Sequence, residues 1–325
     1  MGCTSGANQY WGGILLTESS VVSASYLELR HSYHGIFMMK GSEALLVMDH
    51  ARFVKNHFNI QNEPTPTANV GNSVLIEDSL FLDFTGNGVS SRGGEVTLQR
   101  VVIANARNAI GHTPRALRIR DDSDDNSYFA ADHVTLHSVE YLVDNIKNAP
   151  GSLMSITNSI KSSGQLRGSY SDPMALSDNL YYNVSAISYL PEAGSMNENP
   201  LFVDPSENDL RVTHRSGALK PVQTGGAALG GLAFDGALTI KLMGHIYDSL
   251  TLGNEQDHFI EGDLIVEPSA ELIIAGGTNI YVVQADLLRG GTNASYPELT
   301  IYGELNIQST AETPVRFDSL NINTR

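Results

Sequence analysis

The feature that most constrains this chain is a short segment that recurs along its first two thirds. Each copy alternates apolar and polar residues over a few positions, as a half-buried strand does, and Gly, Asn or Pro separates it from the next copy. The copies recur at intervals of roughly 20 to 40 residues, which is typical of solenoid repeats. They start at Leu27, Val47, Val74, Val96, Val134, Met154 and Met174.

A single copy cannot bury its apolar face alone, so successive copies must stack. Parallel strands about 4.8 Å apart would pile Leu29, Ile76, Leu98, Leu136 and Ile156 into one apolar column. We therefore predict an all-β fold, a right-handed parallel β-helix (β-solenoid) over 1–216. A Gly-rich linker over 217–237 and further β-solenoid rungs over 238–325 are expected to follow it.

The same alignment predicts a column of residues at one bend of the coil. At a bend, short polar side chains usually cap backbone groups, and this is the structural interpretation. The functional alternative is a line of groups that faces a long ligand. Two longer segments, 61–72 and 112–132, are expected to be loops that stand out from the coil. The column contains His31, His50, Asp78, Arg100, Ser138, Asn158 and Asp178.

Composition restricts the partners. With 20 Lys and Arg against 36 Asp and Glu, the formal net charge is −16, which argues against nucleic acid. It also disfavours anionic polysaccharides unless a divalent cation bridges the two negative surfaces. Cys3 is the single cysteine, so neither disulfides nor a cysteine metal site are expected. No apolar run approaches the length of a membrane span, and we expect no membrane insertion.

Three motifs carry a resemblance to a known family. "WGGI" at 11–14, "SDNLYYNV" at 177–184 and "NPLFVDPSENDLRV" at 199–212 resemble bacterial secreted right-handed parallel β-helix proteins of the pectin-lyase-like fold. The resemblance implies export to the outside of the cell or to its surface, with no signal peptide in this chain. That class includes polysaccharide lyases, glycosidases, tailspikes and adhesins, so the resemblance implies a fold without selecting a reaction.

The order of the motifs also differs from that family. In such proteins, rungs like "GELNIQSTAETPVRF" at 303–317 come before a "WGGI" rung, whereas here they follow it. The chain therefore resembles a slice through a tandem array. Either it is part of a longer surface protein, or the Phe317 end of one molecule stacks on Trp11 of the next, or 1–9 forms an ordinary cap.

The candidate catalytic and metal-binding residues gather in one stretch. Asp121, Asp122, Asp124 and Asp125 follow three arginines and are candidate ligands for calcium, the one cofactor that we consider. The alternative is a solvated acidic loop paired with its own arginines. The resemblance implies that a lyase of this fold would use lysine or arginine as a base. The catalytic candidates are Arg118, Arg120 and Lys147, with Asp78 as a carboxylate for a hydrolase.

Two functions follow from these observations. The first is an extracellular β-solenoid that serves as a surface, structural or adhesive module, binds carbohydrate and stacks end to end. The second is a calcium-assisted polysaccharide lyase or glycoside hydrolase. The expected partners are therefore a polysaccharide or a second copy of this chain. Whether the protein is an enzyme stays open, because no catalytic signature is present in the sequence.

Overall fold

The computed structural model describes residues 10–320, except 18, 40–42, 64–71, 110, 121–126, 147–152, 169–173, 187–193, 235, 237–240 and 284. The chain divides into two compact units, each described separately below. The first comprises Met1–Asn179, Asn183–Ser195 and Leu229–Leu232, and the second comprises Leu180–Tyr182, Met196–Ala228 and Ala233–Arg325. No helix in the described part of the chain is long and apolar enough to cross a bilayer.

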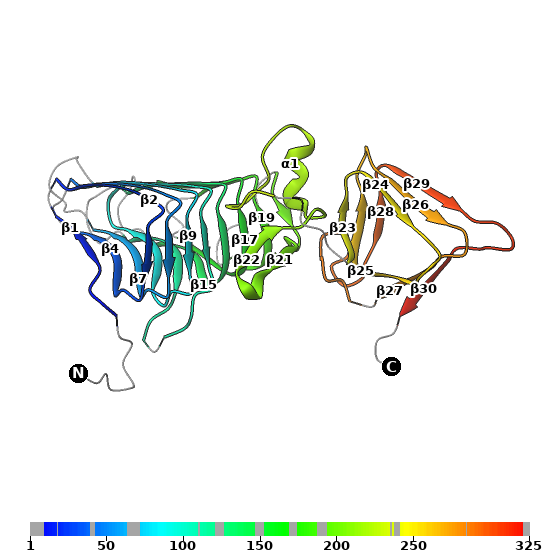
Figure 1. Ribbon diagram of the computed structural model, residues 1–325, viewed down its shortest axis with the longest axis horizontal. Coiled ribbons are helices and arrows are strands. Elements are labelled where there is room, and N and C mark those ends of the chain that lie inside the picture. The colour runs from blue at the N-terminus through cyan, green and yellow to red at the C-terminus, as the bar shows by residue number, and fades with distance from the viewer. Residues whose placement is uncertain are drawn as a thin grey trace. The chain divides into compact units, whose positions relative to one another are not determined.

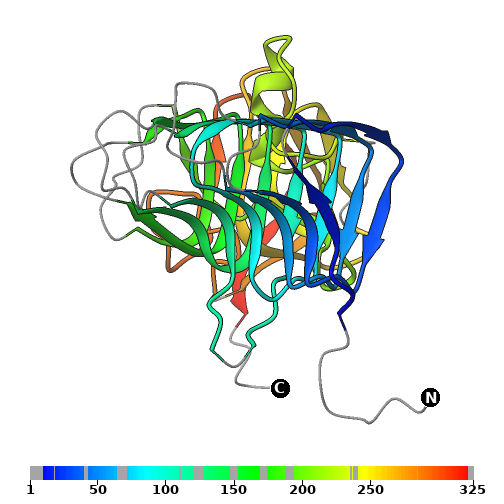
Figure 2. The same cartoon turned by 90° about the vertical axis from the view of Figure 1, so that its left-hand side faces the viewer.

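The first unit is a coil of parallel strands (Figure 1). One wall is a seven-stranded sheet whose members pair in parallel as the chain returns to the same side. Viewed from its end, the coil shows strands on several sides of a common interior (Figure 2). The seven strands are β2 (Val21–Ser25), β5 (Leu45–Asp49), β8 (Ser73–Glu77), β11 (Gly94–Gln99), β14 (Ser127–Asp132), β16 (Leu153–Thr157) and β18 (Ala175–Ser177).

Two further rows of parallel strands complete the coil, and long strands join them. β15 (Thr135–Ile146) and β17 (Ile160–Gly168) run through both rows. One row contains β3 (Glu28–Arg30), β6 (Arg52–Val54), β9 (Leu80–Leu82) and β12 (Val102–Ala104). The other row contains β1 (Ile14–Leu16), β4 (His34–Met38), β7 (Phe58–Asn62), β10 (Asn87–Ser91) and β13 (Arg115–Arg120).

The interior is apolar, as the repeat predicts, but its residues pile into more than one column. Leu29 and Leu136 belong to a stack that continues through Phe53, Phe81 and Ile103. A separate stack on the seven-stranded sheet contains Met48, Ile76, Leu98, Ala131 and Ile156. The expected single column is therefore wrong, because the three-sided coil directs side chains inward from each wall.

At two bends of each rung of the coil, a residue adopts a left-handed backbone conformation. Five of the seven residues predicted at one bend do lie together, but His31 and Ser138 belong to the second bend. Their places at the first bend are taken by Tyr26 and His133. The first bend contains Tyr26, His50, Asp78, Arg100, His133, Asn158 and Asp178, and the second contains His31, Lys55, Asp83, Asn105, Ser138, Ser163 and Asn183.

The second unit begins where β19 (Leu180–Ala186) pairs with β20 (Met196–Asn197). An antiparallel hairpin follows, formed by β21 (Phe202–Asp204) and β22 (Asp209–Val212) around the short helix η1 (Pro205–Glu207). Asp204 caps η1 by accepting hydrogen bonds from the backbone N–H groups of Ser206 and Glu207. The helices η2 (Gly217–Leu219) and α1 (Lys220–Gln223) lie in the predicted linker.

Parallel strands form the rest of the second unit. One sheet contains β23 (Leu242–Ile246), β25 (His258–Val266), β27 (Asn279–Val283), β28 (Leu299–Ile301) and β30 (Arg316–Leu320). The other contains β24 (Ser249–Leu252), β26 (Glu271–Ala275) and β29 (Glu304–Gln308). An apolar core of Leu, Ile and Val fills the space between them. The all-β, parallel, solenoid-like character predicted from the sequence is thus confirmed.

Candidate functional site

The candidate site lies on the outer face of the row formed by β4, β7, β10, β13, β15 and β17. Strand alternation sends Ile36, Ile60 and Leu117 into the core, where all three are fully buried. The residue after each of them points to the opposite face. These outward positions stack across successive strands as Phe37, Gln61, Ser90, Arg118, Asp144 and Arg167.

Three arginines surround one aspartate on this face, and we call them together the arginine cluster: Arg115, Arg118, Arg167 and Asp144. The Asp144 side chain is fully buried, with 0% of its surface exposed. Its carboxylate lies 2.5 Å from Arg115 Nε, 3.6 Å from Arg118 Nε and 3.8 Å from Arg167 Nε. Arg115 also donates a hydrogen bond to the backbone oxygen of Thr113. The buried carboxylate accepts a hydrogen bond from Arg115 and lies within 4 Å of the guanidinium groups of Arg118 and Arg167.

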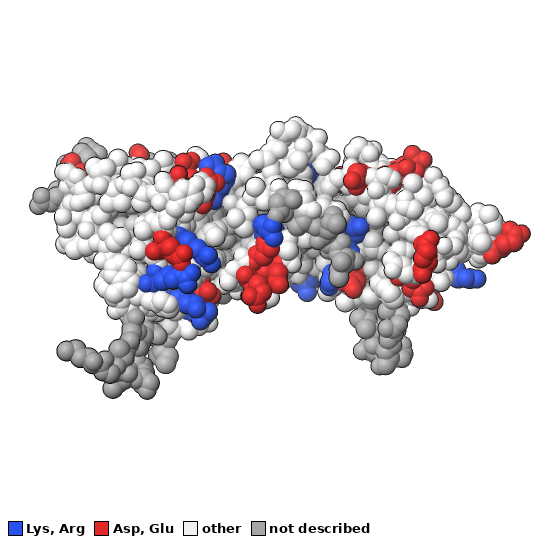
Figure 3. Space-filling view, viewed as in Figure 1, with Lys and Arg blue, Asp and Glu red and all other residues white. Residues whose placement is uncertain are grey.

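An aromatic ring lies beside the arginine cluster. Tyr141 neighbours Arg115 in the strand register, and Arg115 and Arg167 lie 5.8 and 5.6 Å from the centre of its ring. Such cation–π contacts hold guanidinium groups flat and leave their edges available for hydrogen bonds. Figure 3 shows that basic and acidic side chains lie beside one another on the face of the first unit that is turned to the viewer.

The described residues of the arginine cluster carry a net charge opposite in sign to that of the whole chain. Three positive charges face one carboxylate in the arginine cluster, although the chain as a whole carries −16. The next outward positions contain a further pair, in which Arg92 lies 3.9 Å from Glu63. Because short-range fields act over less than about 10 Å at ordinary salt, a ligand at this face meets the arginines rather than the net charge.

Aromatic rings continue the same face towards its N-terminal strands. Tyr33 packs against His34, His57 and Phe58, with ring centres 4.8 to 5.6 Å apart. Burial lowers the pKa of His57 to about 4, and the neighbouring charges of His112 and His34 act in the same direction. Burial also lowers the pKa of His34. At neutral pH these imidazoles are therefore uncharged rings suited to stacking.

The structure brings together only some of the predicted catalytic residues. Arg118 and Arg120 lie two positions apart on β13, and Arg118 belongs to the arginine cluster. Asp78 lies at the first bend, where Arg100 donates two hydrogen bonds to its carboxylate at 2.7 and 2.9 Å. These hydrogen bonds lower the pKa of Asp78. Lys147 falls outside the described residues.

The predicted calcium ligands Asp121, Asp122, Asp124 and Asp125 also lie outside the described residues. Within the described ranges, no group of three or more His, Cys, Asp or Glu side chains is arranged to hold a metal ion. The predicted loop over 112–132 is wrong for most of its length. Its two ends form strands β13 and β14, since their alternating apolar residues face the core.

Trp11 and Phe317, the candidate assembly residues, are both exposed at 46% of their surface. Trp11 forms a parallel bridge to Ser32, and its ring nitrogen donates to the backbone oxygen of Arg30. Phe317 lies on β30 opposite Ile280.

Sequence reasoning missed Asp144 and Arg167. The spacing of these residues could have identified them, because Arg118, Asp144 and Arg167 follow one another at intervals close to one turn of the repeat. Extending the alignment beyond the bend would have placed all three in one column. Comparison of this chain with protein-family models, with curated proteins and with solved structures gave no match.

Proposed function

We propose that this chain is the right-handed parallel β-helix of a secreted or cell-surface bacterial protein, and that its outer face binds an acidic polysaccharide. The observation that supports this proposal best is the arginine cluster, in which the fully buried Asp144 accepts a hydrogen bond from Arg115 and lies within 4 Å of Arg118 and Arg167. A planar guanidinium recognises a carboxylate through two parallel hydrogen bonds. Uronate sugars present such a carboxylate at each residue of the polymer.

The arrangement of the face suits a polymer more than a small molecule. The outward column crosses six strands, from Phe37 to Arg167, with neighbouring strands about 4.8 Å apart, and its exposed side chains lie beside the buried Gln61, Ser90 and Asp144. A chain of sugars lying across the strands would meet the aromatic rings near Tyr33 and the guanidinium groups farther along. Stacking on rings and pairing with arginines are complementary, because a sugar offers both an apolar face and polar substituents.

Replacement of Arg167 by Gln tests the proposal. The Arg167 side chain is 42% exposed, so the fold should tolerate the change. Losing one charge-assisted contact should weaken the binding of polygalacturonate, followed by titration calorimetry, by about tenfold or more. Arg107→Gln is the matched control, since Arg107 is 60% exposed and pairs with Asp83 at the second bend. Equal affinity of wild type and Arg167→Gln, or equal binding of neutral dextran, would contradict the proposal.

The position of Arg118 favours a second candidate function, a calcium-assisted polysaccharide lyase or glycoside hydrolase. Arg118 lies between Ser90 and Asp144 in the outward column, where a bound uronate would contact it. A lyase forms an unsaturated product that absorbs in the ultraviolet. Absorbance that rises with polygalacturonate and calcium, and that disappears with chelator and in Arg118→Ala, would support this function over simple binding. A flat absorbance trace would exclude the lyase, and a further absence of newly released reducing sugar would exclude the hydrolase and leave the binding module as the proposed function.

We also propose that molecules stack end to end. β1 is the first strand of its row and β30 the last of its sheet, so both present backbone groups at an edge. Trp11 and Phe317 lie at these edges and are half exposed. A head-to-tail contact of this kind repeats without closing and would build a filament.

A further inference from the structure

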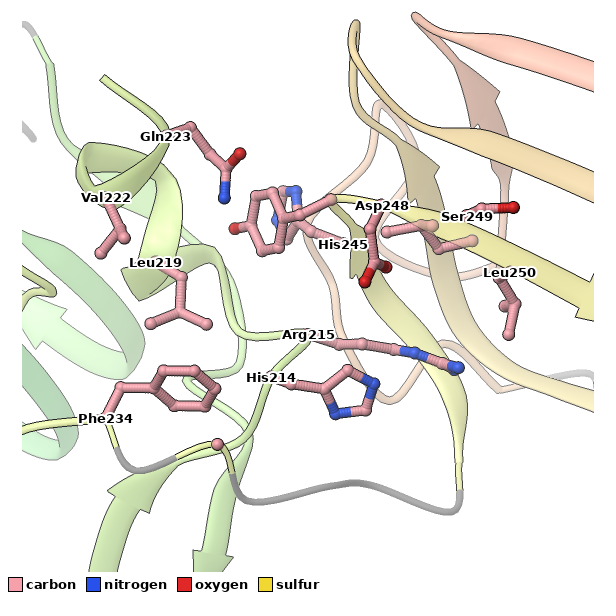
Figure 4. A pocket seen from close by; sticks show the side chains of 13 residues that line it. His214, Arg215, Leu219, Val222, Gln223, Phe234, His245, Asp248, Ser249 and Leu250 are labelled. Atoms are coloured by element: carbon pink, nitrogen blue, oxygen red, sulfur yellow. The ribbon is translucent and has the colours of Figure 1, made fainter. Parts of the chain in front are cut away.

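A cavity of about 590 Å³ lies within the second unit, remote in sequence from the arginine cluster. Its lining comes from the segment that carries η2 and α1, from Phe234, and from β23 with the start of β24. Figure 4 shows Leu219, Val222 and Phe234 on one side of the cavity and Asp248, Ser249 and Leu250 on the other. This volume is in the range of sites that bind small molecules.

Apolar and aromatic side chains form most of the lining. Leu219, Val222, Phe234 and Leu250 contribute apolar surface. His245 contributes only its ring, because Glu267 and Glu198 occupy its two nitrogens at 2.6 and 3.1 Å. The hydroxyl of Tyr247 is likewise occupied, since it donates to the backbone oxygen of Ser216 at 2.8 Å. A ligand would therefore meet apolar surface over much of its body.

Two opposite charges, Arg215 and Asp248, lie in the lining, and Asp248 acts electrostatically on Arg215 although no ion pair within 4 Å joins the two described residues. Arg215 is buried, with 7% of its surface exposed, and donates one hydrogen bond to the backbone oxygen of Lys241. Asp248 is exposed, and its carboxylate has no hydrogen-bond partner among the described residues. Figure 4 shows the Arg215 side chain extending beneath Asp248.

We propose that this cavity binds an α-amino acid with an apolar side chain. The carboxylate of the ligand pairs with Arg215, whose remaining N–H groups form a fork that matches it. The ammonium group lies towards Asp248 at the exposed rim. The apolar side chain of the ligand packs between Leu219, Val222 and Phe234. A zwitterion satisfies both charges, whereas a simple anion would meet the repulsion of Asp248.

Calorimetric titration of the whole chain with three probes tests this proposal. L-phenylalanine carries both charges, 3-phenylpropionate lacks the ammonium group, and 2-phenylethylamine lacks the carboxylate. We expect L-phenylalanine to bind at least about tenfold more tightly than either analogue, since each analogue leaves one charged group of the site unpaired. Undetectable binding of L-phenylalanine at millimolar concentration, or equal affinity for 3-phenylpropionate, would overturn the proposal.

Two variants locate the binding in this cavity without touching the buried arginine. Val222 is 43% exposed, so Val222→Trp should fill the cavity while the unit still folds, and binding should be lost. Val203→Trp is the control, because Val203 is 37% exposed on β21 and does not line the cavity. Asp248→Asn should remove the preference for L-phenylalanine over 3-phenylpropionate. Unchanged binding in Val222→Trp would place the ligand elsewhere and refute the inference.

Discussion

Asp144 is the buried counter-charge of the arginine cluster, and its replacement by Asn should lower the free energy of unfolding. The substitution keeps the size of the side chain but leaves three guanidinium groups without their buried counter-charge. Breaking one partner of a buried ion pair typically lowers the free energy of unfolding by about 3–5 kcal/mol. Urea denaturation at neutral pH, followed by circular dichroism, measures the change.

Asp78→Asn is the matched control for this prediction. Asp78 also accepts two hydrogen bonds from an arginine, but both partners are partly exposed. Exposed ion pairs contribute only about 0–1 kcal/mol, and Asn tolerates the left-handed backbone of this bend. If Asp144→Asn cost no more than Asp78→Asn, the buried carboxylate would not be the residue that organises the cluster.

Lys55 allows the backbone strain at the bends to be measured. It is exposed, has φ of 58° and occupies the second bend. A side chain in this conformation costs about 1–2 kcal/mol, whereas glycine loses about 0.5–1 kcal/mol in conformational entropy. Lys55→Gly should therefore raise the free energy of unfolding by about 0.5–1 kcal/mol. Arg52→Gly, in the neighbouring strand β6, should lower the free energy of unfolding. Thermal denaturation of both variants shows whether the two changes in stability have opposite signs.

At the scale of elements, β23 carries a buried imidazole that makes the second unit sensitive to pH. Burial lowers the pKa of His245, but the hydrogen bonds with Glu198 and Glu267 outweigh it and raise the pKa above the ordinary 6.5. Because the pKa of His245 is higher in the folded state than in the unfolded state, protonated His245 stabilises the fold. This stabilisation is complete below pH 6.5 and is lost as the pH rises through the pKa of His245 in the folded protein. His245→Gln should remove this loss, which thermal denaturation over a series of pH values would show.

Glu267 determines the lower end of the pH range in which the interaction of His245 with Glu267 stabilises the second unit. Its hydrogen bond with His245 lowers its pKa below 4.5, and Lys220, 3.8 Å away, acts in the same direction. Its contribution is present above pH 4.5 and is lost as the pH falls through the lowered value. The difference in stability between wild type and His245→Gln should thus be largest between these limits. A difference that does not vary with pH would contradict the assignment.

The first unit should respond to pH in the opposite direction. Burial lowers the pKa values of His57 and His137 to about 4. A lowered histidine pKa contributes stability that is complete above pH 6.5 and is lost as the pH falls towards 4. Trp11, the single tryptophan, lies in the first unit, so its fluorescence follows the unfolding of that unit. The midpoint temperature of thermal unfolding, followed by this fluorescence, should fall as the pH is lowered. A midpoint temperature that rises would contradict the lowered pKa values of the two histidines.

The residues at the two bends show which parts of the coil can be predicted from the sequence. The alignment placed His50, Asp78 and Arg100 correctly, because each ends a strand with clear alternation of apolar and polar residues. It misplaced His31 and Ser138 because both bends end in a left-handed residue and look alike in sequence. The strand β2, "VVSAS", and the strand β14, "SYFAAD", were not recognised as copies of the repeat. The alignment therefore used the strand of the next wall in these two rungs and selected the residue of the second bend instead of the first.

At the scale of the whole molecule, the candidate site was only partly predictable. Arg118 was recognised from its place in a charged stretch, but Asp144 lies in "YLVDNI", where apolar neighbours suggest only a core strand. Net charge alone also does not describe the candidate site, since the chain carries −16 while the arginine cluster is locally positive. Charge summed over a solenoid does not describe any one of its faces.

End-to-end stacking can be separated from other kinds of association by mixing variants. Trp11→Asp alters the edge of the first unit beside β1 and Phe317→Asp the β30 edge of the second unit, and both side chains are half exposed, so the fold should persist. By light scattering over a range of concentrations, wild type should form particles that grow without limit. Each variant alone should remain monomeric, because its intact end meets only damaged ends.

An equal mixture of the two variants should yield dimers and nothing larger. The intact Phe317 end of one variant can bind the intact Trp11 end of the other, after which both free ends are damaged. Tyr296→Asp serves as the control, since Tyr296 is 62% exposed in a turn of the second unit and its replacement should leave growth unchanged. Dimers of Trp11→Asp alone would indicate a symmetric contact, and monomeric wild type at every concentration would exclude stacking.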